Sequence, residues 1–141
     1  MSVEISVTQD FTAAPERVYD SWLDAKRLGD WMFRQTMQDE PLHIKIDARV
    51  GGAFSFLVRR NGQEIDHVGE YLQLSRPGRI VFTWGIAGMG ASSRVVLDIH
   101  PHGDGTRLTL VADIPDQWAD YADRTRAGWS KILAAQADAI S

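Results

Sequence analysis

The sequence contains no cysteine, no long apolar run and no run of basic residues. Without cysteine, disulfides and thiolate metal sites are excluded, and a reducing cytoplasm is the simplest location. No apolar segment approaches the roughly 20 residues that a membrane-spanning helix needs, and no signal peptide is recognisable at the start. The net charge of −4 argues against a phosphate-binding face. We expect a soluble, cytoplasmic protein that binds neither membrane nor nucleic acid.

The residues that are present predict one globular domain over 1–141. Hydrophobic residues make up 44 % of the chain and charged residues 24 %, the balance of an ordinary folded domain. Polarity alternates from Val3 to Phe11, which predicts a strand with one buried face. Pro15 then opens a short helix that lacks a good cap, because Ala14 precedes it. Asp24 can cap a second short helix, with Gly29 marking a break.

From Leu42 to Ala112 the pattern is that of six antiparallel strands joined by turns. Alternating apolar residues recur in each segment, and Asn61-Gly62 is a strong hairpin signal because both positions tolerate positive φ. Asp116 can cap a final helix, in which apolar residues recur at three- and four-residue steps from Trp118 to Ile140. The expected architecture is α+β, a curved seven-stranded antiparallel sheet around a long C-terminal helix, with two short helices after the first strand.

Six motifs resemble one known family in the right order. They are FTAAPERVYDSWLDAKRLGDWM (11–32), DARVGGAFSF (47–56), HVGEY (67–71), RIVFTW (79–84), GDGTRLTL (103–110) and Gly128-Trp129. Together they resemble the START-like helix-grip (SRPBCC, Bet v 1-like) superfamily, and most closely the branch of the activator of the ninety-kilodalton heat-shock protein ATPase.

This resemblance implies a helix-grip fold with a deep cavity between the sheet and the last helix. Members of the wider superfamily bind apolar small molecules, and some are enzymes. One eukaryotic member of the branch is a two-domain co-chaperone, but this chain has no room for the additional N-terminal domain.

The candidate ligand-binding residues are aromatic or lie beside aromatic residues. Phe54, Phe56, Phe82 and Trp84 either line the cavity or simply fill the core. At the start of the last helix, Trp118 and Tyr121 could close the cavity or pack in the core. Trp129, further along that helix, completes the aromatic set.

His67 and Tyr71 lie four residues apart on one strand, hence on one face, and Gly69 between them is expected to leave open space. An imidazole and a phenol aimed at one place could orient a carbonyl or move a proton. In the alternative interpretation, Gly69 relieves crowding where the strand bends, the histidine is hydrogen-bonded within the sheet, and a bulge changes the face it sees.

Two further patterns predict neither a zinc site nor a phosphate-binding loop. His100 and His102 could bind zinc, but the remaining ligands of a zinc site are missing, so they are interpreted as an exposed strand end. The glycines at 85, 88 and 90 lack the Lys-Ser/Thr of a phosphate loop and predict a mobile lip near the cavity mouth.

We therefore expect a non-catalytic protein that binds an apolar or aromatic small molecule, with no metal and no cofactor. One alternative is a cyclase- or hydrolase-like enzyme that uses His67 and Tyr71. Another is a co-chaperone-like module that binds a chaperone through the outer sheet surface. The edge strand 42–48 could also support a homodimer.

Overall fold

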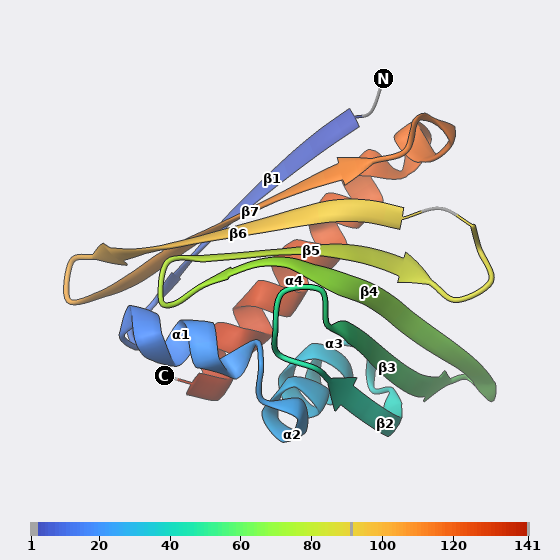
Figure 1. Cartoon of the computed structure of the whole chain (residues 1–141), viewed down its shortest axis with the longest axis horizontal. Coiled ribbons are helices and arrows are strands. Elements are labelled where there is room, and N and C mark those ends of the chain that lie inside the picture. The colour runs from blue at the N-terminus through green and yellow to red at the C-terminus, as the bar shows by residue number, and fades with distance from the viewer. Residues whose placement is uncertain (1–2, 91, 141) are drawn as a thin grey trace.

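A seven-stranded antiparallel sheet forms most of the molecule, with the order β1-β7-β6-β5-β4-β3-β2 in the computed structural model, which describes residues 3–90 and 92–140 (Figure 1). Its strands are β1 (Val3–Phe11), β2 (Glu40–Ile46), β3 (Ala53–Arg60), β4 (Gln63–Ser75), β5 (Arg79–Ile86), β6 (Ser92–His102) and β7 (Gly105–Ile114). The α+β helix-grip architecture predicted from the sequence is therefore confirmed.

Strand alternation places one apolar row on the face toward the last helix. In β7, for example, Leu108, Leu110, Ala112 and Ile114 are buried while the residues between them are half-buried. The β3–β4 hairpin turns at Asn61 and Gly62, whose φ values are +52° and +79°, as the dipeptide predicted.

The first helical segment follows β1 and covers one end of the sheet. Helix α1 (Pro15–Ser21) begins after Ala14, which makes no side-chain cap. Helix α2 (Ala25–Leu28) is capped by Asp24, whose Oδ1 accepts from the Arg27 backbone N–H at 3.2 Å.

The break predicted at Gly29 is wrong. The chain continues from α2 through a π-helical segment η1 (Gly29–Arg34) into α3 (Gln35–Met37) without leaving the helical path. A Cβ at Gly29 would lie 3.3 Å from Ile44 Cγ1. This glycine therefore serves the close approach of the helix to β2 rather than a break in the helix.

The C-terminal helix α4 (Ala122–Ile140) runs behind the sheet and contacts β1 and η1 (Figure 1). Its 19 residues correspond to about 28 Å, and its buried stripe is Trp129, Ile132, Leu133, Gln136 and Ile140. The expected start is wrong, because Asp116–Tyr121 forms a 3₁₀ segment, η2, with Pro115 rather than Asp116 at the N-cap position.

Strands β1 and β2 are the two edges of the sheet, in agreement with the edge expected near Leu42. Among the described residues, no helix is both long and apolar enough to cross a membrane.

Candidate functional site: an aromatic groove beside the C-terminal helix

The predicted aromatic residues of β3, β4 and β5 share the inner face of the sheet because of the register of these strands. Phe54 lies opposite Gly69 and Phe56 opposite His67, while Tyr71 lies opposite Phe82. The rings are close: the Phe54 and Phe56 centroids are 4.7 Å apart, and those of Phe54 and Tyr71 are 5.4 Å apart. All of these side chains are buried, so β3–β5 present one continuous aromatic layer toward the helices.

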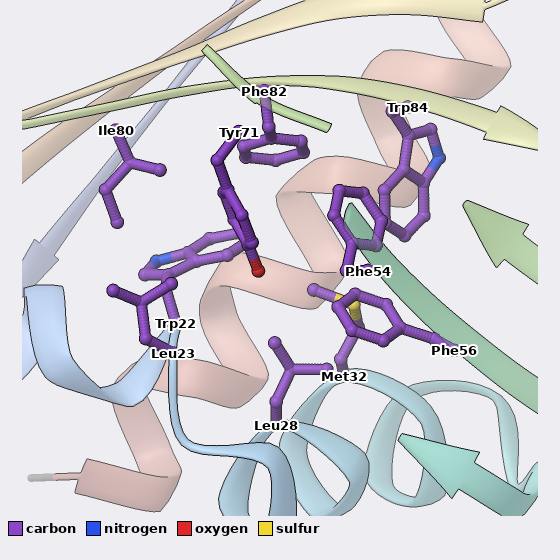
Figure 2. A pocket seen from close by; sticks show the side chains of 10 residues that line it. All are labelled: Trp22, Leu23, Leu28, Met32, Phe54, Phe56, Tyr71, Ile80, Phe82 and Trp84. Atoms are coloured by element: carbon purple, nitrogen blue, oxygen red, sulfur yellow. The ribbon is translucent and has the colours of Figure 1, made fainter. Parts of the chain in front are cut away.

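This aromatic layer fills the space where the resemblance implied a deep cavity. Figure 2 shows its side chains around a narrow gap that Trp22 and Leu28 also line, with the Tyr71 hydroxyl directed into it. The gap has a volume of only about 10 Å³, about what one water molecule requires. Phe54, Phe56, Tyr71 and Phe82 therefore act here as core residues.

The open space expected at Gly69 is also absent. A Cβ at this position would lie 1.8 Å from the Thr83 carbonyl oxygen and 2.5 Å from Cζ of Phe54. The Phe54 ring thus lies directly over Gly69, between His67 and Tyr71. Gly69 is required for close packing rather than for an opening.

Open space is found instead between the end of β5 and the start of α4. Two adjoining hollows, together called the groove below, share Trp84, Ile86, Thr125 and Trp129. The tyrosine lobe, of about 290 Å³, is also lined by Ser93, Ile114, Trp118 and Tyr121. The histidine lobe, of about 200 Å³, is also lined by Met32, Phe33, Arg60, His67, Gly128 and Ile132. Ligand pockets usually span roughly 300–1,000 Å³; each lobe alone lies below this range, and only the two adjoining lobes together reach it.

Two indoles form the wall between the lobes. Trp84 from β5 and Trp129 from α4 meet edge to face, with centroids 5.2 Å apart. Figure 2 shows the Trp84 indole nitrogen on the side away from Tyr71, so the polar edge of this residue is not part of the closed core. A flat aromatic molecule in either lobe would contact an indole.

His67 is held in one defined state inside the histidine lobe. Its Nδ1 lies 3.1 Å from the Phe56 carbonyl oxygen; since a carbonyl can only accept, Nδ1 carries the proton of the neutral ring. The imidazole packs against Phe33 and Trp84, with ring centroids 5.0 and 5.3 Å away. Burial lowers the pKa of His67 below its ordinary value, and the hydrogen bond to Phe56 offsets only part of this effect. His67 is therefore neutral at pH 7.

This lowered pKa predicts a dependence of stability on pH. Below the ordinary histidine pKa of about 6.5, His67 binds a proton in the unfolded chain but remains neutral in the folded protein. The free energy of unfolding therefore decreases as pH falls through that value. Urea unfolding at pH 7.5 and 5.5 should show this loss in the wild type. The His67→Asn variant, which keeps a donor near the Phe56 carbonyl but does not titrate, should lose less stability over the same interval. An equal loss in both proteins would contradict the prediction.

An ion pair borders the histidine lobe and was not predicted from the sequence. Arg60 Nε and Nη2 donate to the two carboxylate oxygens of Asp39 at 2.8 and 2.7 Å. The Asp39 side chain is 0 % exposed and that of Arg60 31 % exposed. The pair raises the pKa of Arg60. One signal was available: alternation from Phe54 through Phe56 and Val58 places Arg60 on the inner face.

The candidate residues thus divide into two groups. His67, Trp84, Trp118, Tyr121 and Trp129 line the groove. Phe54, Phe56, Tyr71 and Phe82 surround the small gap, where Trp84 also contributes. Four residue steps along β4 separate His67 from Tyr71 by about 13 Å, so their side chains do not meet at one point. His100 and His102 lie exposed at the end of β6.

Comparison with known proteins agrees with the fold. The family model described as activator of Hsp90 ATPase homolog 1-like protein matches residues 12–140. The chain belongs to this family. No curated protein matches it.

Several solved structures are similar over nearly their whole length. A protein from Chromobacterium violaceum is 28 % identical, with a TM-score of 0.80, and the match covers 97 % of this chain and 96 % of that one. A protein of unknown function from Staphylococcus aureus has a TM-score of 0.85 at 18 % identity, covering 99 % and 94 %. An AHSA1-like protein from Aeromonas hydrophila has a TM-score of 0.83 at 18 % identity, covering 98 % and 92 %. At this level of identity the last two matches show the fold alone.

Proposed function

We propose that this protein binds one small apolar or aromatic molecule in the groove, without transforming it, in the cytoplasm. The single observation that carries the proposal is the groove itself, where three indoles, one phenol and several aliphatic side chains surround open space. The family contributes the general expectation of a ligand-binding helix-grip domain.

The separation of His67 from Tyr71 favours binding over catalysis by this pair. Catalysis through His67 and Tyr71 would need both groups within reach of one substrate atom. Tyr71 belongs to the closed gap and His67 to the groove, so this pair does not form a common site.

Naphthalene is a suitable first probe, and the five tryptophans report its position. Trp84, Trp118 and Trp129 line the groove, whereas Trp22 and Trp31 are buried beside α1 and η1. We expect the indole N–H signals of the first three to shift in ¹⁵N-correlated spectra while the other two stay in place. For ten heavy atoms at roughly 0.4–0.7 kcal/mol each, the Kd should lie between about 10 µM and 1 mM.

A groove-filling variant tests the location. Thr125 lines both lobes, so Thr125→Trp should abolish the shifts. Ala127→Trp adds the same side chain at an exposed position of α4 that lines neither lobe, and it should bind naphthalene as the wild type does. Unshifted groove signals in the wild type, or binding that persists in Thr125→Trp, would overturn the proposal.

A further inference from the structure

The histidine lobe contains a hydrogen-bond acceptor that the described residues do not satisfy. Because Nδ1 of His67 donates to the Phe56 carbonyl, its other nitrogen, Nε2, carries a lone pair and no proton. Within residues 3–90 and 92–140, no hydrogen bond is made to Nε2. His67 is only 6 % exposed and lines the lobe, so a molecule in the groove can supply the partner of this atom.

The surroundings of His67 fix this acceptor in place. The rings of Phe33 and Trp84 pack against the imidazole at tilted angles, and the bond to Phe56 fixes its rotation. The burial that lowers the pKa of His67 keeps Nε2 unprotonated at neutral pH. An entering molecule therefore meets a rigid acceptor rather than a cation.

The groove presents no unbalanced charge to an ionic ligand. Among the described residues that line the two lobes, Arg60 is the single charged one. The Nε and Nη2 edge of its guanidinium is already bound by the buried Asp39 carboxylate. A carboxylate entering the lobe would lose hydration and meet the lone pair of Nε2, with no free cation in compensation.

From these contacts, and resting on the proposed function, we infer that the ligand is a neutral aromatic molecule that donates a hydrogen bond to Nε2 of His67. Phenols and aromatic N–H compounds of one or two rings are the chemical class that fits. A ring without a donor displaces water from Nε2 and makes no hydrogen bond in its place, so it binds more weakly by about the worth of that bond. His67 is thus the residue that determines specificity.

Three ligands of matched shape test the inference: naphthalene, 2-naphthol and 2-naphthoate, titrated at pH 7.5 against the groove tryptophan signals. We expect 2-naphthol to bind about three- to tenfold more tightly than naphthalene, the worth of one neutral hydrogen bond, and 2-naphthoate to bind most weakly. In wild-type protein labelled with ¹⁵N, the Nε2 resonance of His67 should shift with 2-naphthol and much less with naphthalene.

The variant His67→Asn separates the two proposals. It can still donate to the Phe56 carbonyl but has no atom at the Nε2 position, so 2-naphthol and naphthalene should bind it equally. Tyr71→Phe, in the closed gap, should keep the wild-type preference. Equal binding of the two ligands to the wild type would overturn the inference while leaving the proposed function intact, and so would tighter binding of 2-naphthoate. If no ligand shifts the groove signals, the proposed function fails as well.

Discussion

Replacing Gly69 with alanine should destabilise the protein by at least about 3 kcal/mol, at the upper end of the cost of overpacking a core. The added Cβ would lie 1.8 Å from the Thr83 carbonyl oxygen and 2.5 Å from the Phe54 ring. A flexible side chain could move aside, but the Thr83 oxygen belongs to the backbone of β5. Relief therefore requires β4 and β5 to shift, together with the aromatic layer packed over them. The free energy of unfolding in urea measures the effect.

Gly128→Ala is the matched control for this substitution. Gly128 lies in α4, and a Cβ there would have no atom within 4 Å. Alanine at a helical glycine with open space should stabilise the protein by about 0.5–1 kcal/mol. We therefore expect Gly69→Ala to lower the free energy of unfolding and Gly128→Ala to raise it. If Gly69→Ala unfolds within 0.5 kcal/mol of the wild type, the close contact of Phe54 with β4 is wrong.

The fold could be predicted because its signals are local. Alternation from Val3 to Phe11 needs only a sheet with one buried face, and Asn61-Gly62 specifies a hairpin by its own backbone freedom. Gly29 shows the limit of such signals. Within one helix a glycine predicts a break, but the reason for this glycine lies in Ile44, on a strand that pairs elsewhere.

The candidate site could be predicted only in part, because aromatic residues on one face can either fill a space or border it. Phe54 and Phe82 share the parity of Trp84, yet only Trp84 reaches the groove. Which outcome occurs depends on the packing of Trp22, Leu28 and Met32 against the inner face, and no local pattern encodes that. Asp39 was missed for the same reason: its contact with Arg60, 21 residues later, forms only in the folded protein.

Replacing Arg60 should lower the free energy of unfolding more than replacing Asp39, although either substitution breaks the ion pair. In Arg60→Met the aliphatic stem is replaced, but the Asp39 carboxylate, 0 % exposed, loses both of the guanidinium bonds that satisfy it. Leaving a buried charge without its partner destabilises a protein by roughly 3–5 kcal/mol, and we expect a loss of about 3 kcal/mol here. Asp39→Asn should cost about 1 kcal/mol, the worth of a lost hydrogen bond, because Arg60 is 31 % exposed and water can solvate it.

The double variant Asp39→Asn/Arg60→Met decides whether this asymmetry arises from the orphaned charge. If it does, removing the carboxylate as well should restore part of the stability that Arg60→Met loses, so the double variant should be more stable than Arg60→Met alone. Urea unfolding of the four proteins at one pH gives the coupling energy of the pair. A double variant less stable than Arg60→Met would instead mean that each side chain contributes independently. The wall of the histidine lobe would then depend on the packing of these residues rather than on the balance of their charges.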